Sequence, residues 1–448
     1  MFLIKFFNSS ICLCCDSTFS KYPPRLPRSV QALRAGPSTM SFLVSSEQVI
    51  HFSFNLHIDT VQFSSKIYSM KVKRTIDTKI KEFLTKKTTD NILFIWGPRR
   101  SGKTTLLQKF AKEMKAPIFN FDFISDRQRF VPTEDSLRKL AQENEIIFID
   151  EIQNYPAATV PIKILNDVYK IKVVATGSSE LRQKAGEDFD TMAGRFQEIY
   201  CLPLSTKEIY NHEHVNIHDK GLFERNLVKN LSMFGAYPEV YLSKSSESYK
   251  IKRLEKIIET YVLKDIIDIY NLKNIKLAKD ILTKVALQLG SEVSVREIAN
   301  SLQANMGTVT SYIEIFIKNY ILIPLPSFKT NARKAVSENR KLYFYDLGIR
   351  NALIKDFREI ELRPDAGGLW ENLVVIEFEK MKKINGLLQT HYFYREYGGK
   401  EVDFIIEDYK KNYTCVEIKK SKGKIRTIFP LPHKSKVITK DNFVEEFV

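Results

Sequence analysis

Cysteine is scarce in this chain of 448 residues, which holds only five. Three of them crowd positions 12, 14 and 15, whereas Cys201 and Cys415 stand alone in separate regions. This usage argues against a disulfide framework and indicates a reducing compartment, so we expect a cytoplasmic protein. Long apolar runs are also missing. The longest fall well short of the roughly 20 residues that a membrane-spanning helix needs, and we therefore expect no membrane partner.

Acidic residues are outnumbered by basic ones. There are 53 Asp and Glu against 69 Lys and Arg, which gives a formal net charge of +16. Such an excess attracts polyanions, and we predict nucleic acid, DNA in particular, as a partner; a generally basic proteome would produce the same balance. The hydrophobic share of 44% and the charged share of 27% are ordinary for a globular protein. At this length about two to four domains are expected.

Residues 16–69 have little charge and no sustained hydrophobic period. The opening "MFLIKFFNSSICLCC" imitates a signal peptide, but Asn8, Ser9 and Ser10 interrupt its apolar run. A clear amphipathic helix begins only at Met70. We therefore predict that residues 1–69 form a poorly structured extension, which a wrongly assigned start codon would explain.

Short apolar strands alternate with helices from residue 91 onward. We expect strands over 92–96, 117–123, 145–150 and 172–178, with helices over 104–114, 136–143 and 161–169. Continuous apolar strands in this alternation predict an α/β fold with a parallel sheet covered on both faces. The sheet domain is expected to span residues 70–210. Helical patterns then predict a helical lid over residues 211–285.

Residues 286–345 are expected to form a winged helix-turn-helix. Two short helices flank "QANMG", and a strand follows them. The second helix of such a module can enter a major groove, but the same module also serves as a plain packing unit. Here the second helix, "TVTSYIEIFIKN", offers few basic side chains, so both alternatives stay open. A third α/β segment is expected over residues 346–448.

A glycine-bracketed basic loop lies between the first expected strand and its helix. It fits the phosphate-loop pattern G-x-x-x-x-G-K-[ST], in which inward-pointing backbone N–H groups and a helix N-terminus hold phosphate oxygens. The residues predicted to bind ATP here are Gly97, Pro98, Arg99, Arg100, Ser101, Gly102, Lys103, Thr104 and Thr105. Lys103 is expected to reach the β- and γ-phosphates, and Thr104 to bind Mg²⁺.

Partner residues for the loop follow later strands. "EIIFIDEIQNYP" ends an apolar strand in Asp150 and Glu151, the pattern of a Walker B strand. Asp150 is predicted to bind Mg²⁺ through water, and Glu151 to orient or deprotonate the attacking water. Ser178 is a candidate contact for the γ-phosphate or the water, or else a helix cap. Arg195 is a candidate to stabilise transition-state charge, from a neighbouring subunit or from its own lid, or else a surface residue.

The chain resembles prokaryotic P-loop ATPases of the AAA+ type that carry a C-terminal domain of unknown function with a nuclease-like fold. The matching stretches are "GPRRSGKTTLL", "IIFIDEIQNYP", "VVATGSSEL", "AGRFQEIYCLPLS", "FGAYPEV", "KLYFYDLGIRNAL", "GGLWENLVVIEFEKM", "YREYGGKEVDFII" and "VEIKKSKG". They cover most of residues 75–425 in order. The resemblance implies an AAA+-like sheet, a helical lid, a winged-helix segment and a C-terminal restriction-endonuclease-like α/β domain. One departure is Lys264 in "YVLKDI", where such proteins tend to have Arg.

A second set of polar residues lies near the C-terminus. Asp403 is expected on one strand and Glu417-x-Lys419 on the next, the spacing of PD-(D/E)XK nucleases. In a hairpin, Asp403 and Glu417 can share a divalent cation while Lys419 positions or activates water. Glu371 or Glu377, from a preceding helix, is expected to add a ligand. A basic run over residues 420–426 either contacts a phosphate backbone or is a solvated loop.

The sequence thus predicts a Mg²⁺-dependent ATP hydrolase associated with nucleic acid. Its nucleotide state is expected to reposition a winged helix and a nuclease-like domain. A homo-oligomer is compatible with an arginine supplied by a neighbouring subunit. The alternative is a nucleotide-dependent regulator, or protein-interaction switch, whose nuclease-like domain has lost cleavage.

Overall fold

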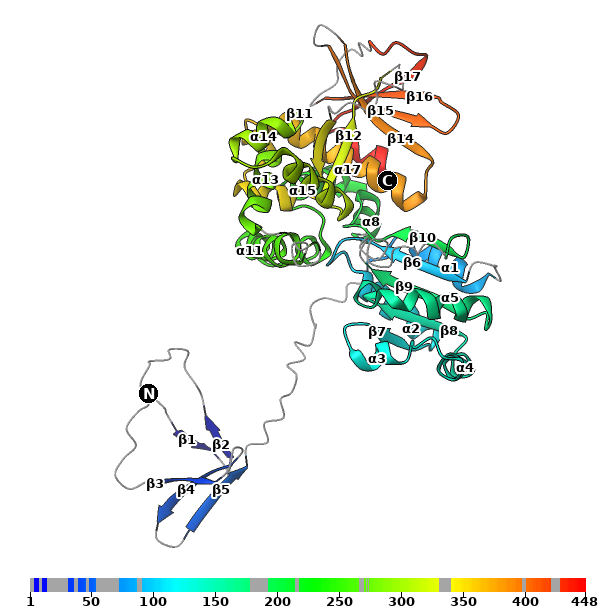
Figure 1. Ribbon diagram of the computed structural model, residues 1–448. Coiled ribbons are helices and arrows are strands. Elements are labelled where there is room, and N and C mark those ends of the chain that lie inside the picture. The colour runs from blue at the N-terminus through cyan, green and yellow to red at the C-terminus, as the bar shows by residue number, and fades with distance from the viewer. Residues whose placement is uncertain are drawn as a thin grey trace. The chain divides into compact units, whose positions relative to one another are not determined.

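The structure is a computed structural model of the whole chain (Figure 1). The chain divides into two units, Met1–Ser69 and Met70–Val448. The residues described are 4–7, 10–13, 31–35, 39–45, 48–53, 72–86, 91–177, 192–213, 217–265, 270, 272, 274–329, 340–396, 400–419 and 428–448.

The first unit holds two small antiparallel sheets. Strand β1 (Ile4–Phe7) pairs with β2 (Ser10–Leu13), and β4 (Thr39–Ser45) lies between β3 (Gln31–Ala35) and β5 (Gln48–Ser53). The sequence predicted a poorly structured extension here, and these strands are a difference from that expectation. Strands of four to seven residues are too short for a hydrophobic period to stand out. That the segment is foreign to the native protein stays a prediction.

Five parallel strands form the sheet of the second unit that carries the phosphate loop (Figure 1), in the order β10-β6-β9-β8-β7. The strands are β6 (Ile92–Trp96), β7 (Ile118–Asn120), β8 (Ile146–Asp150), β9 (Lys172–Gly177) and β10 (Phe196–Tyr200). The predicted α/β fold with a parallel sheet is confirmed. Strand β10 was not expected: it is an edge strand with a polar, partly exposed sequence, so it lacks the continuous apolar run of a central strand.

Both faces of this sheet are buried. Helices α1 (Asp77–Thr85) and α2 (Lys103–Met114) pack on one face against residues such as Leu93. Helices α4 (Glu134–Glu143) and α5 (Thr159–Asp167) pack on the other face against residues such as Phe94. Successive strand residues point to opposite faces, so burial of both faces explains why β6 is apolar throughout. The short segments between these elements are α3 (Ile124–Gln128), η1 (Ile152–Asn154) and η2 (Pro156–Ala158).

Helices dominate the next part of the second unit. They are α8 (Thr206–His212), η3 (Ile217–Asp219), α9 (Lys220–Phe234), α10 (Pro238–Tyr241), α11 (Glu247–Ile257), η4 (Ile258–Asp265), α13 (Ile275–Leu287), α14 (Val295–Ser301) and α15 (Met306–Lys318). A three-stranded antiparallel sheet follows, in the order β11-β13-β12. Its strands are β11 (Glu292–Val293), β12 (Leu322–Pro326) and β13 (Arg340–Phe344).

Helix α16 (Leu347–Ile354) packs on this helical part, although the predicted boundary at residue 346 assigned it to the C-terminal domain. Arg350 donates hydrogen bonds to the carbonyl of Ala286 on α13, at 3.1 and 2.7 Å. Asn351 donates to the carbonyl of Ser232 on α9, at 2.8 Å. Buried side chains therefore tie α16 to the helices that precede it.

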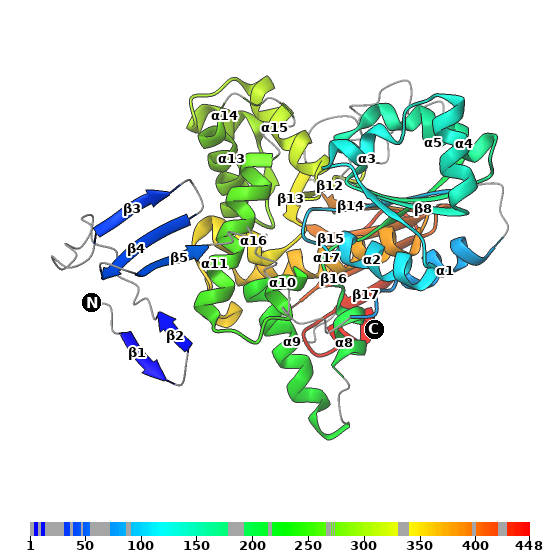
Figure 2. The ribbon, with the colours of Figure 1, turned by 90° about the horizontal axis from the view of Figure 1, so that it is seen from below.

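The C-terminal part is a four-stranded sheet with one long helix beside it (Figure 2). Strands β14 (Gln389–Arg395), β15 (Glu401–Asp408) and β16 (Tyr413–Ile418) are antiparallel neighbours, and β17 (His433–Ile438) is parallel to β16. Helix α17 (Ala366–Asn385) packs on the sheet through Phe378, whose ring stacks on that of Phe404 with 5.0 Å between the ring centres. The short helix α18 (Phe443–Phe447) ends the chain.

One hydrophobic core runs through the helical part, the three-stranded sheet and the C-terminal sheet. It contains, for example, Leu227 of α9, Phe316 of α15, Trp370 of α17 and Phe447 of α18. These parts therefore share buried surface rather than packing as separate domains. Within the described ranges, no helix has the length and apolar content needed to cross a membrane.

Candidate functional site

The phosphate loop joins β6 to α2 at the carboxyl edge of the parallel sheet. Gly97 is required by a close approach: a Cβ there would lie 2.0 Å from the carbonyl oxygen of Cys201, which follows β10. The same contact brings the Cys201 N–H to the carbonyl of Trp96 at 2.7 Å. Gly102, with φ of 99°, directly precedes α2. Strand pairing and these two glycines thus set the path of the loop.

Lys103 lies inside this loop. Its Nζ atom donates hydrogen bonds of 2.9 Å to the carbonyls of both Gly97 and Pro98, and its side chain is buried. Burial lowers the pKa of Lys103, although the negative charges of Glu151 and Asp150 act to raise it. The ammonium group therefore lies inside the curved loop backbone. It is near the carboxylates of Asp150, which ends β8, and of Glu151.

Asp150, at the end of β8, meets two hydroxyl groups. Thr176 on the neighbouring strand β9 donates to Asp150, and the Thr104 hydroxyl at the start of α2 also hydrogen-bonds to it. Burial raises the pKa of Asp150, although both hydrogen bonds work in the other direction. The two residues predicted to bind Mg²⁺, Thr104 and Asp150, are thus in contact. Their hydroxyl and carboxylate oxygens are the hard ligands that suit Mg²⁺.

Glu151 follows Asp150 in a left-handed backbone conformation, with φ of 54°. Gln153 donates a hydrogen bond to its carboxylate. A non-glycine residue in this conformation is uncommon, and such residues are found at active sites among other places. Ser178, the predicted γ-phosphate contact, lies outside the described residues.

Arg74 holds the phosphate loop in place through hydrogen bonds. The sequence did not point to this residue. Arg74 donates to the carbonyls of Ser101 at 2.8 Å and Leu202 at 2.5 Å, and to the Glu208 carboxylate at 3.0 Å. Burial acts to raise the pKa of Glu208, but the charge of Arg74 and the hydrogen bonds to Glu208 lower it overall. No local motif marks Arg74, because its partners are 27 to 134 residues away in the sequence.

Arg100 points from the loop toward the helical part. Its Nη1 atom lies 2.8 and 3.1 Å from the two carboxylate oxygens of Glu239 on α10. Arg253 on α11 binds the same carboxylate at 2.5 Å. A bridge of three charged side chains therefore connects the phosphate loop to α10 and α11.

Arg195 lies at the amino ends of the parallel strands, whereas the phosphate loop lies at their carboxyl ends. Arg195 directly precedes β10, whose first residue pairs with Ile92, whereas the phosphate loop follows Trp96 at the other end of β6. Five strand residues separate the two edges by about 16 Å. Arg195 also binds Asp167 at the end of α5, at 2.9 and 3.0 Å. The alternative in which Arg195 serves the phosphate loop of its own chain is therefore disfavoured by strand register.

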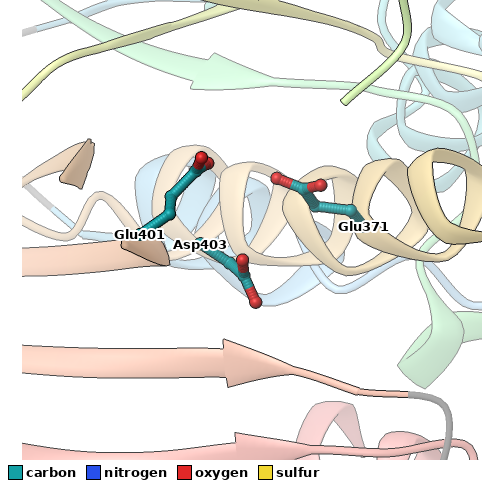
Figure 3. A group of neighbouring side chains, drawn as sticks. All are labelled: Glu371, Glu401 and Asp403. Atoms are coloured by element: carbon teal, nitrogen blue, oxygen red, sulfur yellow. The ribbon is translucent and has the colours of Figure 1, made fainter. Parts of the chain in front are cut away.

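A second group of polar side chains lies between α17 and β15 (Figure 3). Carboxylate oxygens of Glu371, Glu401 and Asp403 lie within 4.8 Å of one another. Two residues of β15, Asp403 and Phe404, oppose Phe393 on β14 in a β-bulge. Phe404 stacks on α17, and Asp403 lies near Glu371 of the same helix. The bulge thus brings a strand carboxylate to the helix that carries Glu371.

Cations already neutralise part of this group. Lys341 on β13 is 2% exposed; its Nζ atom lies 2.8 Å from Glu371 and also contacts Glu401. Tyr343 donates to Glu371 at 2.5 Å, and Arg395 binds Glu401 at 2.5 Å. Three carboxylates therefore share two positive charges. One net negative charge is left over, and three carboxylate ligands suit a hard divalent cation.

Asp403 is the least neutralised of the three carboxylates. Burial, together with the charge of Glu371, raises its pKa to about 7, although it accepts a 2.8 Å hydrogen bond from the N–H of Ile418. Glu417 adds to this rise by its charge, so it is near. It nevertheless lies outside the group of three, and its carboxylate binds Lys419 at 3.3 Å.

The structure separates the two helix candidates. Glu371 joins the carboxylate group, but Glu377 accepts a 2.8 Å hydrogen bond from the N–H of Thr206 on α8 and pairs with Lys380 at 2.8 Å. Six helical residues turn through about 600°, so these two side chains point about 120° apart. Glu401 was missed by the sequence analysis, although its place two residues before Asp403 on a strand was a usable signal. The predicted basic run 420–426 lies outside the described residues.

Three family models match the chain. Residues 89–210 match an AAA domain, residues 225–359 match a domain of unknown function (DUF8612), and residues 366–431 match another domain of unknown function (DUF4143). Together with the five-stranded parallel sheet and its loop, the first match identifies an AAA-type P-loop ATPase fold. This agrees with the resemblance seen in the sequence.

The chain also resembles several individual proteins. It is 27% identical over 349 residues to the uncharacterised protein MJ1544 of Methanocaldococcus jannaschii, covering 73% of this chain and 75% of that one. It is 24% identical over 286 residues to an uncharacterised protein of Haemophilus influenzae, covering 60% and 70%. Among solved structures, the Walker-type ATPase paby2304 of Pyrococcus abyssi aligns with 62% of this chain and 94% of its own, with 15% identity and a TM-score of 0.41.

Proposed function

We propose that the protein binds and hydrolyses ATP with Mg²⁺ and couples its nucleotide state to a nuclease-like C-terminal domain acting on nucleic acid, DNA in particular. The observation that carries the ATPase part is the meeting of Lys103, Thr104 and Asp150 at one edge of the parallel sheet. Ligands of α/β sheets bind at the carboxyl ends of the strands, where this loop lies.

Each residue of the loop site then has a role. Lys103 exchanges its two carbonyl partners for β- and γ-phosphate oxygens, and the N-terminus of α2 adds its positive end. Mg²⁺, held by Thr104 and Asp150, would neutralise charge that develops on the phosphates. Glu151, held by Gln153 beside Asp150, orients the attacking water and accepts its proton.

The first experiment measures ATP binding and turnover of the full chain. Lys103→Ala is expected to abolish binding, because it removes the ammonium that pairs with the phosphates. Glu151→Gln is expected to bind ATP normally but to lose turnover by about 100-fold or more, the usual contribution of a general base. Lys112→Ala, an exposed lysine of α2, serves as the charge-matched control. Equal turnover by Glu151→Gln and wild type would remove Glu151 from this role.

Coupling between the two sites is proposed to run through α17. This helix carries Glu371 of the carboxylate group. Six residues farther along, at Glu377 and then at Lys380, it contacts the ATPase part. Lys380 donates to the carbonyl of Leu204, and Glu377 accepts from Thr206, both in the segment that follows β10. The net charge of +16 supports a nucleic-acid partner for the assembly.

Cleavage of nucleic acid is proposed for the C-terminal carboxylate group. A divalent cation held by Asp403, Glu371 and Glu401 would act on a phosphate group, and Lys419 with Glu417 would position the attacking water. One observation favours the alternative of a regulator without cleavage. The Lys341 ammonium already lies between Glu371 and Glu401, where it substitutes for part of a cation's charge.

Manganese titration separates these two functions. In the cleaving protein, calorimetry without nucleotide is expected to detect Mn²⁺ binding that Asp403→Ala abolishes, with metal-dependent cleavage of DNA lost in the same variant. Asp408→Ala, at the far end of β15, is the matched control and should retain both. ATP turnover should persist in both variants. Absence of Mn²⁺ binding and cleavage in the wild type would favour the regulator.

Arg195 is proposed to act on the nucleotide of a neighbouring subunit in a homo-oligomer. Its place at the amino edge of the sheet, away from its own phosphate loop, supports this role over one within the same chain. Its pairing with Asp167 leaves the side chain about one third exposed, which is compatible with exchange to a new partner.

A further inference from the structure

A cavity of about 340 Å³ lies between three parts of the second unit. Its walls come from Tyr200 at the end of β10, from the end of α15 with β12, and from α17 with β14. No residue of the phosphate loop or of the carboxylate group lines it. The volume is at the lower end of the range for small-molecule sites, roughly 300 to 1,000 Å³, so it suits a small ligand.

One end of the cavity is basic. Lys382, Lys383 and His391 gather around Glu379, at 2.9, 3.6 and 3.4 Å from its carboxylate oxygens. Glu379 is the one acidic side chain among the described residues that line the cavity, although Glu198 also acts on Lys383 from farther away. A single carboxylate does not neutralise two ammonium groups. A phosphate group would supply the missing negative charge.

Aromatic rings also line the cavity. Tyr200, Tyr320, Tyr345 and Phe404 line the cavity, with Tyr320 at 6.3 Å from Tyr200 and 5.8 Å from Tyr345 between ring centres. The ammonium of Lys383 lies 4.9 Å from the ring of Tyr200 and so joins the basic end to the aromatic wall. Flat ring systems bind to such surfaces by stacking and edge contacts.

His391 offers a buried polar atom at this cavity. Its side chain is 6% exposed, and within the described part of the chain its Nε2 atom has no hydrogen-bond partner, while Nδ1 faces Glu379. Burial lowers the pKa of His391, which keeps the ring neutral near pH 7. With Nδ1 donating to Glu379, Nε2 is a hydrogen-bond acceptor. A buried polar atom without a partner is costly, and a ligand donor would satisfy it.

We propose that this cavity binds a nucleotide of one base and one phosphate, with the phosphate at Lys382 and Lys383 and the planar base against the tyrosines. The ligand is either a free nucleoside monophosphate or the 5′-terminal nucleotide of a nucleic-acid strand. Because the cavity touches β10, β12 and α17 together, its occupant contacts the ATPase sheet, the three-stranded sheet and the C-terminal part at once. The proposal does not depend on ATP hydrolysis or on cleavage.

The test uses the full chain with Lys103→Ala, which removes binding at the phosphate loop. Calorimetric titration with AMP, GMP, CMP and UMP is expected to show one site for at least one of them. Adding Lys383→Met should weaken that binding by at least tenfold, because it removes the phosphate partner but keeps the length of the side chain. Lys440→Met, a lysine of similar exposure paired with Glu361 outside the cavity, should leave it unchanged.

Two further arms complete the experiment. Competition by a short 5′-phosphorylated oligonucleotide, but not by its unphosphorylated form, identifies a strand end as the ligand; failure of both to compete identifies the free nucleotide. Lys382→Met repeats the test if Lys383→Met does not fold by circular dichroism. The proposal is overturned if neither the four monophosphates nor the phosphorylated oligonucleotide binds, or if binding is the same in the lysine variants and the control.

Discussion

Glu379 illustrates how a single buried carboxylate can be held ionised. It is 9% exposed and contacts His391, Lys382 and Lys383, and Tyr345 donates to it at 3.2 Å. Burial acts to raise its pKa, but the hydrogen bond from His391 and the two lysine charges lower the pKa to about 2. The folded protein therefore binds this proton more weakly than the unfolded chain does.

This shift predicts a specific acid sensitivity. Because the folded pKa lies below the unfolded value, the stabilisation is present above about pH 4.5 and is lost as pH falls toward 2. Between pH 5 and pH 3.5, Glu379 should account for a loss of about 1 kcal/mol in the free energy of unfolding. Urea unfolding of wild type and Glu379→Gln at both pH values measures it. A variant that loses as much stability as the wild type over this interval would contradict the assignment.

Helix α17 is the element that joins the ATPase sheet to the C-terminal sheet. Its Glu377 and Lys380 are 3% and 2% exposed, pair with each other, and bind backbone groups of the segment after β10. Removing one partner of a buried ion pair leaves the other charge unpaired, which costs about 3 to 5 kcal/mol. This pair is therefore expected to make the two parts unfold together.

The chain provides two fluorescent probes for this expectation. Trp96 lies in β6 and Trp370 in α17, and these are the only tryptophans. In Trp96→Phe and Trp370→Phe backgrounds, the wild-type sequence should give the same urea midpoint from either probe. Glu377→Gln should lower stability and separate the two midpoints, because Lys380 is left without its carboxylate.

An exposed pair supplies the control for this prediction. Glu361 binds Lys440 with both side chains partly exposed, and such pairs contribute about 0 to 1 kcal/mol. Glu361→Gln should therefore leave the midpoints together and nearly unchanged. Coincident midpoints in Glu377→Gln would show that α17 is coupled to the sheet by its apolar contacts alone.

At the scale of the whole molecule, the placement of Arg195 predicts an assembly. Arg195→Ala should lose ATP turnover while retaining ATP binding, because its own phosphate loop is intact. Mixing it with Lys103→Ala, which keeps Arg195 but cannot bind ATP, should restore part of the turnover, since each supplies what the other lacks. Turnover is measured at several mixing ratios. Two inactive variants that stay inactive together, in a protein shown to be oligomeric, would exclude action between subunits.

The phosphate loop and the carboxylates after β8 could be predicted from sequence because their geometry is local. Residues 97–104 lie between one strand and one helix, and Asp150 ends a continuous apolar run, so short segments carry the whole signal. Strand β10 was not predicted because an edge strand forms by hydrogen bonding to its neighbour, here β6, and does not need a continuous apolar run. The role of Arg74 depends on partners that only folding brings close.

The sequence by itself determined the class of fold and the phosphate loop, and it marked Asp403 as a candidate metal ligand. Tertiary structure alone decided which carboxylates lie beside Asp403 and that Lys341 pairs with them. It also decided at which end of the parallel strands Arg195 lies. The same holds for the cavity, whose walls come from segments as distant as Tyr200 and Phe404. The physical reason is common to all of these cases. Periodicity reports burial along one element, whereas register, bulges and the packing of α17 determine which side chains from different elements meet.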